Sequence, residues 1–417
     1  MRRVVITGIG VVSPNGLGRE AFWQATRAGI SGVRDITAIA GEASPVRVGG
    51  HLADFDPRAV MEDHDLANVG RVVPLALAAA GEALADAGLE PEKFSLAERR
   101  GFAVSLGTGG GALAFVERQF ATYFGGHEKR CSVYTIPSAT PGSLASEVSM
   151  RFGLHGYSHL LSTGCTSSTD ALGHARRTIA TGEAERVLAG GADAPLAPLI
   201  IKAFCMMKIL TPAWNHAPAR ASRPFCAGRD GFVLGEGAWL FVLEEREQAR
   251  ARGARIYAEI TGYGSTCEAF HRVRLEESGE EPARAMQIAL TQAGVLPEEL
   301  DYVNLHGTAT QLNDRIETRA LKLALGKAAV RVPGSALKSL IGHPQGASGA
   351  AGVAATLLAM RDGWLPPTIN LDHPDPECDL DYVPHQGRAR AIGHALCNCI
   401  GFGSKNSALV LSRAESS

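Results

Sequence analysis

The sequence lacks the features that mark membrane, secreted or nucleic-acid-binding proteins. Its 41 Lys and Arg residues nearly balance its 43 Asp and Glu residues, so no global field favours nucleic acid or a membrane surface. The most membrane-like stretch, residues 347–360, holds about 14 small and apolar residues, too few to span a bilayer. The eight cysteines show no C-x-x-C spacing, and a chain of 417 residues needs no disulfide framework. We therefore expect a reducing, cytoplasmic compartment.

We expect neither a secretory leader nor a low-complexity linker in this sequence. Thr7 and Gly8 interrupt the apolar run near the N-terminus, which favours a buried first strand over a signal peptide. At 417 residues the chain exceeds one ordinary core, so we expect two similar-sized lobes or one large α/β domain. Runs of Val, Ile and Leu alternate with Ala-rich runs, as in α/β proteins with short connections. The expected strands include Val4–Ile6, Phe102–Leu106, Arg186–Leu188, Tyr302–Leu305 and Leu409–Leu411, and the expected helices cover 72–87, 166–181, 281–293, 315–325 and 347–361.

Short glycine-containing segments of the first half recur in the second half. The matching pairs are residues 6–10 with 260–264 and residues 104–108 with 303–308. The offsets of the two pairs differ by roughly 50 residues, so the first half would carry insertions that the second half lacks. Chance similarity of such strands is the alternative. A true repeat predicts a duplicated α/β fold that breaks near 251–254, with halves 1–252 and 253–417.

One cysteine, Cys165, lies on a tight turn between an apolar run and a helical pattern. His159–Ser162 reads as a short buried strand, Gly164 permits a sharp turn, and apolar residues recur behind it at helical spacing. Cys165 is therefore expected at a helix N-terminus, where unpaired N–H groups and the helix dipole favour a thiolate. The alternative is a buried cysteine that acts as a small hydrophobic side chain.

Two later segments offer partners for a nucleophile. His306 stands at the end of a strand-like run, and Lys338 and His343 precede a helix rich in Gly and Ala. Each histidine alone is compatible with a structural role. The small residues of 346–356 also have a reason unrelated to catalysis, because they allow a helix to pack close to its neighbours.

Together these motifs resemble the elongating β-ketoacyl-[acyl-carrier-protein] synthases, which are thiolase-fold condensing enzymes. The family's Cys-His-His set matches Cys165, His306 and His343. Further matching motifs, in the same order, are Val4–Pro14, residues 221–225, residues 229–237, residues 366–371 and Gly401–Gly403. The resemblance spans essentially the whole chain and implies a duplicated, layered α/β/α/β/α fold.

The resemblance also implies a reaction, the decarboxylative Claisen condensation of an acyl-enzyme thioester with malonyl-[acyl-carrier-protein]. Cys165 would carry the acyl group, and neutral His306 and His343 would donate N–H groups to the enolate formed by decarboxylation. The backbone N–H groups of Cys165 and Phe402 would form a second oxyanion hole. No metal and no cofactor is implied beyond the phosphopantetheine arm of the acyl carrier protein.

Supporting residues follow from the same resemblance. Lys338 would orient the site in a pair with Glu317, and Thr308 and Thr310 would bond the phosphopantetheine arm. The family also implies that Thr108 lies at the floor of the acyl tunnel and that Phe402 gates it. The supporting residues that the family implies are thus Lys338, Glu317, Thr308, Thr310, Thr108 and Phe402.

Departures from the family pattern leave the pathway open. Ser404-Lys405-Asn406 stands where fatty-acid synthases of this type usually read Gly-Thr-Asn, so a lysine has entered the gating loop. Residues 62–71 lack the usual basic docking cluster for the carrier protein, although Lys208 keeps a basic position. Residues 162–167, 311–318 and 375–384 are closer to the ketosynthase subunit of type II polyketide systems. We expect a homodimer in fatty acid elongation or, alternatively, a polyketide ketosynthase paired with a chain-length factor.

Three other classes of protein deserve comparison. Gly107–Ala112 nominally fits a dinucleotide-binding G-x-G-x-x-A motif, but Glu128, the acid in the expected region, does not end a strand. A chain-length factor itself lacks the nucleophile, which Cys165 supplies here. A metal site is conceivable by residue type, although the spacings match no zinc pattern; its members would be Cys378, Cys397, Cys399, His373, His385 and His394.

Overall fold

The central sheet repeats one strand order in its two halves. The computed structural model describes residues 2–414, and its main sheet has 11 strands in the order β11-β10-β14-β15-β9-β1-β8-β7-β5-β6, with β2 beside β1. From the middle outward, both halves show two antiparallel pairings followed by two parallel pairings. Only Val5 and Ile6 of β1 pair with β9, so the halves meet over two residues. The repeated segments 6–10 and 260–264 lie on corresponding strands, β1 and β9.

The elements of this sheet and its covering helices have the following bounds. The strands of the main sheet are β1 Val4–Ser13, β2 Gly16–Leu17, β5 Phe102–Gly107, β6 Ser158–Leu161, β7 Arg186–Asp193, β8 Gly237–Glu245, β9 Ala258–Cys267, β10 Tyr302–Asn304, β11 Gly334–Ser335, β14 His394–Gly401 and β15 Lys405–Ser412. The helices of eight or more residues are α1 Arg19–Arg27, α4 Val72–Asp86, α6 Leu113–Phe124, α8 Ser143–Phe152, α9 Ser167–Thr181, α10 Pro198–Met206, α12 Glu280–Ala293, α13 Gln311–Leu325 and α15 Ser348–Asp362. Shorter helices are α2 Thr37–Ala40, α3 Asp63–Leu66, α5 Leu96–Arg100, α7 Thr135–Ala139, α11 Arg246–Ala251 and α14 Lys338–Ile341, and small ribbons pair β3 Val33–Asp35 with β4 Val48–Gly50 and β12 Trp364–Leu365 with β13 Arg388–Ala389. No helix in residues 2–414 is long and apolar enough to cross a membrane.

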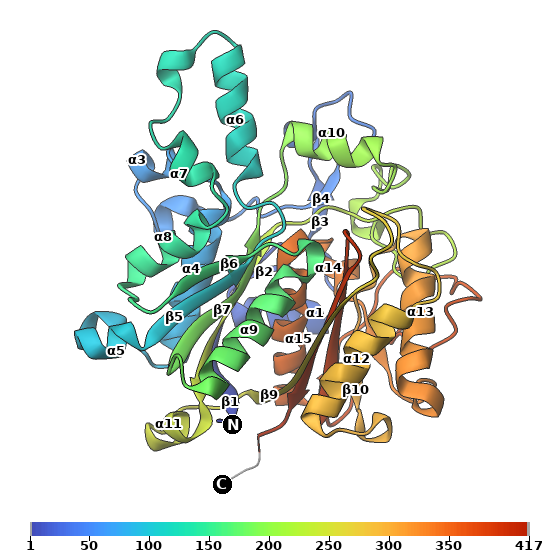
Figure 1. Cartoon of the computed structure of the whole chain (residues 1–417). Helices are drawn as coiled ribbons and strands as arrows, with labels where there is room; N and C mark the ends of the chain where they lie inside the picture. Colours follow the sequence, from blue (N-terminus) through green and yellow to red (C-terminus); the bar gives the residue numbers. More distant parts are fainter. Residues whose placement is uncertain (1, 415–417) are drawn as a thin grey trace.

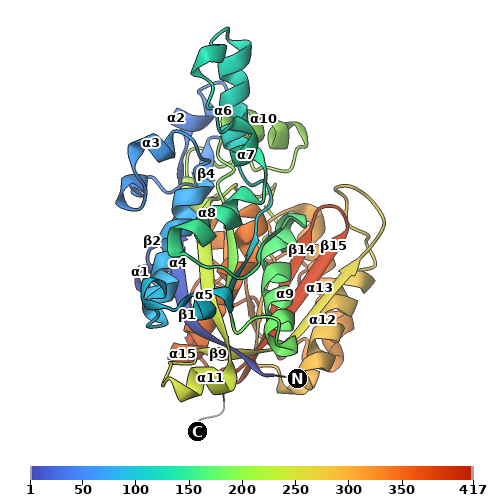
Figure 2. The same cartoon turned by 60° about the vertical axis from the view of Figure 1, so that its left-hand side comes forward.

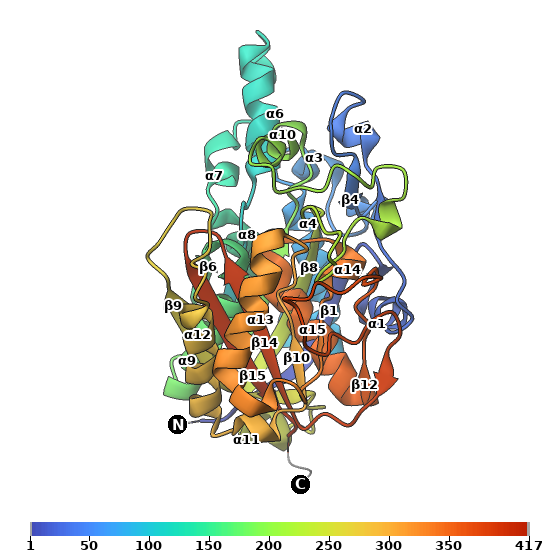
Figure 3. The ribbon, with the colours of Figure 1, turned by 90° about the vertical axis from the view of Figure 1, so that its right-hand side faces the viewer.

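The expected layers are present, with two helices buried at the centre. α9 and α15 pack against each other between the two halves of the sheet, and α4 covers the far face of one half while α12 and α13 cover the other (Figures 1 and 3). Small residues make the central contact possible. A Cβ added at Gly349 of α15 would meet Thr169 Oγ1 of α9 at 2.0 Å, and one at Gly352 would meet Asn304 Oδ1 at 2.2 Å.

One part of the fold differs from the sequence-based expectation. The run His159–Ser162 was expected as a buried strand, but β6 is the edge strand of the main sheet and its side chains are exposed or half-buried. The first half was expected to carry insertions, and the segment between β5 and β6 forms α6, which stands away from the body at the top of Figures 1 and 2, and α7, which lies at the base of α6 beside α8. This insertion exposes several large apolar side chains, among them Phe120, Tyr123, Phe124, Val133 and Ile136.

Candidate active site

The chain brings Cys165 to the carboxyl end of β6, at the entrance to α9. Gly164, with a φ of 72°, turns the backbone after the strand, and Gly164–Thr166 forms one 3-10 turn before α9 begins. The Ser167 hydroxyl accepts the Thr163 N–H and so closes this turn. Cys165 is buried there, at the N-terminal end of a 15-residue helix.

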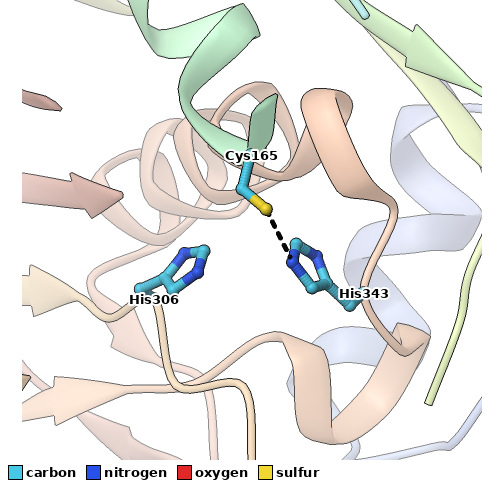
Figure 4. Close-up of side chains that lie close together, drawn as sticks. All are labelled: Cys165, His306 and His343. Atoms are coloured by element: carbon cyan, nitrogen blue, oxygen red, sulfur yellow. Dashed lines mark hydrogen bonds between the residues drawn. The ribbon is translucent and has the colours of Figure 1, made fainter. Parts of the chain in front are cut away.

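The two histidines arrive from the other half of the molecule. His306 follows β10, and His343 follows α14 just before the central helix α15. Figure 4 shows both imidazoles turned toward the Cys165 sulfur. The Sγ of Cys165 lies 3.2 Å from Nε2 of His343, and the two rings are nearly perpendicular, with centroids 5.4 Å apart. The three expected residues therefore meet in one buried cluster.

Burial and a nearby lysine keep both imidazoles neutral. Desolvation lowers the pKa of His306 and of His343 well below the usual value, and the Lys338 charge lowers both further. The Lys338 ammonium lies 3.3 Å from Nδ1 of His306 and donates to the His306 carbonyl at 2.6 Å. Since an ammonium has no acceptor, Nδ1 of His306 takes the lone pair and Nε2 carries the proton.

The tautomer of His343 follows from an unpaired atom. Within residues 2–414, nothing lies at hydrogen-bonding distance from His343 Nδ1, which is buried. A buried N–H without an acceptor is rarer than an acceptor without a donor, so we assign the proton to Nε2. Both histidines then present an N–H toward the space beside Cys165.

The thiolate expected at Cys165 is not the resting form. Burial, together with a smaller effect of the Cys399 thiol, raises the pKa of the Cys165 thiol to about 12, although Lys338 and the Phe402 N–H act in the opposite direction. Desolvation of a fully buried anion outweighs the benefit of the helix N-terminus. The resting group is therefore a neutral thiol, and any thiolate forms only transiently.

In residues 2–414 no direct ion pair joins Lys338 and Glu317, although the Glu317 charge raises the pKa of Lys338 against the effect of burial. They act instead on opposite sides of the His306 backbone: Lys338 bonds its carbonyl, while the Glu317 carboxylate accepts the N–H groups of His306 and Gly307, each at 2.7 Å. Asn398 donates a third bond to Glu317 at 2.7 Å. The physical reason is geometric, because Glu317 on α13 faces the backbone turn after β10 rather than the ammonium. Both residues still fix the position of His306.

A cavity of about 150 Å³ opens beside the triad. Thr308 and Thr310 line it, with their hydroxyl oxygens 3.0 Å apart, as does Phe402 on the turn between β14 and β15. Thr108 does not line this cavity. Its buried hydroxyl donates to the Asp193 carboxylate at 2.8 Å, and its place at the floor of an acyl tunnel stays a prediction.

The structure also bears on two alternatives considered from the sequence, a dinucleotide-binding loop and a metal site. In the glycine-rich segment 107–112, the N–H groups of Gly109 and Gly110 donate to Asp193, at 2.6 and 3.2 Å, so they are not available to a pyrophosphate. In residues 2–414, the only three His, Cys, Asp or Glu side chains close enough to share a metal ion are Cys165, His306 and His343. The six-residue metal cluster considered from the sequence does not form.

Cys399 is a site residue that the sequence analysis placed elsewhere. The sequence offered Cys399 only as a member of a conceivable metal site, but its thiol donates to the Cys165 carbonyl at 3.0 Å and lies 3.5 Å from His306 Nδ1. Asn398 and Asp193 were missed as well. A signal was available for Asn398, since it lies in the strand that leads to the Gly401–Gly403 motif.

Sequence comparison places the chain in a family. The description "Beta-ketoacyl synthase, N-terminal domain" matches residues 1–249, and "Beta-ketoacyl synthase, C-terminal domain" matches residues 257–372. The chain belongs to the β-ketoacyl synthase family. This ketosynthase is therefore an acyltransferase of the condensing type, as the resemblance of its motifs predicted.

Relatives of this ketosynthase come from two pathways. It is 40% identical to 3-oxoacyl-[acyl-carrier-protein] synthase 2 of Coxiella burnetii over 412 residues, which covers 99% of each chain. It is 42% identical to the tetracenomycin polyketide synthase ketoacyl synthase alpha subunit of Streptomyces glaucescens over 421 residues, covering 99% of this chain and 98% of the relative. The family is settled by these similarities, whereas the pathway is not.

Solved structures agree on the thiolase-like fold. A β-ketoacyl synthase from Burkholderia phymatum superposes with a TM-score of 0.90 at 34% identity and full coverage of both chains. The ketosynthase in a complex with its type II polyketide synthase acyl-carrier protein, bound to a hexaketide, has a TM-score of 0.91 at 34% identity, covering 99% of this chain and 100% of that chain. The predicted duplicated, layered fold is confirmed.

Proposed function

We propose that this ketosynthase condenses an acyl group held on Cys165 with malonyl-[acyl-carrier-protein] in fatty acid chain elongation. The observation that carries the proposal is the convergence of two neutral imidazole N–H groups, from His306 and His343, beside a buried thiol. Such donors stabilise negative charge that develops on an oxygen. No further cofactor is needed, because the substrates arrive as thioesters on the carrier protein's phosphopantetheine arm.

Acyl transfer comes first. The Cys165 sulfur attacks the thioester carbonyl, the new S–C bond forms, and the phosphopantetheine thiol leaves with the proton that Cys165 gives up. The backbone N–H groups of Cys165 and Phe402 receive the carbonyl oxygen as it gains charge. The start of α9 and the Lys338 ammonium offset part of the cost of forming the thiolate in a buried site.

Condensation follows on the same scaffold. Malonyl carrier protein loses its carboxylate as carbon dioxide, and the electron pair of the broken C–C bond becomes an enolate whose oxygen lies between the N–H groups of His306 and His343. The enolate carbon attacks the acyl carbonyl on Cys165, and the Cys165 sulfur leaves and takes up a proton. The product is a 3-oxoacyl thioester on the carrier protein. Thr308 and Thr310 hold the phosphopantetheine arm.

Intact-mass analysis tests the first half of this proposal. After incubation with acyl carrier protein, peptide mapping should place a single acyl adduct on Cys165, and Cys165→Ala should remove it. Cys267→Ala is the matched control, because Cys267 is an exposed cysteine outside the site. An adduct that survives Cys165→Ala, or that disappears in Cys267→Ala, would contradict the assignment.

The second candidate function is that of the ketosynthase subunit of a type II polyketide synthase. Relatives from such systems are as similar as the fatty-acid enzymes, and two solved relatives are a ketosynthase with its carrier protein and the ishigamide ketosynthase/chain length factor. The retained Gly401–Gly403 and Asn406 favour the fatty-acid reading. A synthase of fatty acid elongation should elongate acyl carrier proteins when it is purified alone, whereas a polyketide subunit should gain activity only with its partner.

A dimer, homomeric or with a chain-length factor, is part of the proposal. Within residues 2–414, β6 pairs on one side only, at the sheet edge, and the insertion that forms α6 and α7 exposes large apolar side chains in residues 113–136. We propose that these two surfaces meet the partner subunit. We also propose that residues 1–252 and 253–417 are the duplicated halves. Light scattering after size-exclusion chromatography should give about twice the mass of one chain; an active monomer would contradict the proposal.

A further inference from the structure

We infer that Ser404 is a positioning residue that latches the Phe402 turn to residues 268–272 and thereby restricts which acyl chains reach Cys165. The Phe402 turn, residues 402–404, is the three-residue connection of the hairpin in which Gly401 of β14 pairs with Lys405 of β15. The opposing segment, residues 268–272, follows β9. The inference rests on the proposed function for the identity of its acyl substrates.

Ser404 occupies a backbone position that normally requires glycine. Its φ of 64° lies in the left-handed region, where a three-residue hairpin loop commonly places glycine. A non-glycine residue is strained there, because its Cβ approaches the following carbonyl. A serine held in this conformation is therefore compensated by interactions that glycine lacks.

The hydroxyl of Ser404 supplies such interactions through three hydrogen bonds to the opposing segment. It accepts the N–H groups of Phe270 and His271, at 3.2 and 3.1 Å, and donates to the His271 carbonyl at 3.1 Å. A hydroxyl has one proton and two lone pairs, so all its hydrogen-bonding capacity is used. Ala269, with a φ of 50°, turns the opposing backbone so that two successive N–H groups converge on one oxygen.

Backbone bonds join the same two segments. The Glu268 N–H donates to the Ser404 carbonyl at 2.8 Å, and the Gly403 N–H donates to the Arg272 carbonyl at 2.9 Å. Ser404 itself is buried. The Phe402 turn is thus held by backbone hydrogen bonds at Gly403 and at Ser404. The Ser404 hydroxyl is the part of the latch that depends on a side chain.

The latch fixes one wall of the cavity beside Cys165. Phe402 lines this cavity on one side of the latch, and Val273, Arg274 and Leu275 line it on the other. With the latch closed the cavity measures about 150 Å³, below the roughly 300 Å³ at which pockets for small ligands begin. A short acyl group fits without movement, whereas a long one requires the Phe402 turn to move away and the Ser404 bonds to break.

Alkylation of Cys165 tests the latch without relying on catalysis. N-alkyl iodoacetamides with methyl and octyl chains are compared as probes, and the rate of modification at Cys165 is followed by peptide mass spectrometry. Ser404→Gly removes the hydroxyl and relieves the backbone strain, so this variant is expected to fold. In Ser404→Ala, which keeps the strain and lacks the hydroxyl, the octyl-to-methyl rate ratio should exceed that of the wild type by about fivefold or more, the equivalent of one net hydrogen bond. The increase should be smaller in Ser404→Gly, because relief of the strain favours the closed turn.

A neighbouring serine provides the matched control. Ser407 on β15 is fully buried, and its hydroxyl has no hydrogen-bond partner within residues 2–414, so Ser407→Ala removes a hydroxyl without opening the latch. Its rate ratio should match that of the wild type. Hydrogen exchange at the amides of Phe270 and His271 should accelerate in Ser404→Gly and stay unchanged in Ser407→Ala.

The outcomes separate the latch from the proposed function. An octyl-to-methyl ratio in Ser404→Ala within twofold of the wild type, or an equal increase in Ser407→Ala, overturns the latch. Ser404→Ala, which keeps the strain and lacks the hydroxyl, should raise the ratio at least as much as the glycine variant. If the ratios change as expected while the wild type condenses no acyl carrier protein, the latch stands and the proposed function fails.

Discussion

Replacing His306 by alanine should separate the two half-reactions. The Nδ1 atom of His306 faces the Lys338 ammonium, so its Nε2–H is the group that points at the enolate. Removing one preorganised donor of this kind lowers the rate about 10²–10³-fold, which corresponds to about 2.7–4 kcal/mol. Acyl transfer to Cys165 should change much less, because His343 rather than His306 contacts the sulfur, at 3.2 Å.

The scaffold around position 306 should tolerate this change. Lys338 donates to the backbone carbonyl of residue 306 at 2.6 Å, and alanine retains that carbonyl. His306→Gln is the conservative control, because its amide can place an N–H near the former Nε2. His343→Ala should slow both half-reactions, since His343 reaches the sulfur as well as the enolate site.

Two assays read the half-reactions independently. Carbon dioxide released from malonyl carrier protein without an acyl donor reports decarboxylation, and intact mass after brief mixing with acyl carrier protein reports acylation of Cys165. The reasoning is refuted if His306→Ala decarboxylates at the wild-type rate, or if it loses acylation and decarboxylation to the same extent. Partial recovery in His306→Gln would support the role of the N–H group.

Further predictions concern the groups around the triad. Lys338→Met removes a charged hydrogen-bond donor from His306, and such a bond is worth about 1.5–3 kcal/mol, so the rate of decarboxylation should fall about 10- to 100-fold. Lys338→Arg should retain more of the decarboxylation rate, and equal rates in the Met and Arg variants would argue against the assigned tautomer of His306. Glu317→Gln leaves at least one of three buried N–H groups without an acceptor, so it should lower the free energy of unfolding by about 1–3 kcal/mol. Urea denaturation measures this change, and an unchanged midpoint of the unfolding transition would show that these bonds contribute little. Because burial raises the pKa of the Cys165 thiol to about 12, its alkylation by iodoacetamide should rise about tenfold per pH unit from pH 7 to 10, and a plateau below pH 8 would contradict a neutral resting thiol.

The elements that sequence reasoning located share strong local patterns. The Ala-rich run 72–87 became α4, which ends at Asp86, and 347–361 became α15, which begins at Ser348. These helices depend on residues close in sequence, which periodicity describes directly. The grouping of Cys165, His306 and His343 came instead from the resemblance to the β-ketoacyl synthases, because the three residues lie far apart in the sequence.

The features that escaped prediction are tertiary. The exposure of β6 depends on its place at the sheet edge, which a run of four residues does not encode. The neutral state of Cys165 results from burial by segments more than a hundred residues away, and the local helix dipole alone gave the opposite expectation. Glu317 was expected to pair with Lys338, but its carboxylate accepts backbone N–H groups of His306 and Gly307, because the contacts of Glu317 depend on how α13 is rotated.

The measurement that tests the central claim most directly is the stoichiometry of the full reaction. The purified protein, mixed with acyl carrier protein and malonyl carrier protein, should release one carbon dioxide for each 3-oxoacyl carrier protein detected by mass spectrometry, and Cys165→Ala should abolish the product. Product that persists undiminished in Cys165→Ala, or acyl carrier protein that is consumed without release of carbon dioxide, would contradict decarboxylative condensation at this site.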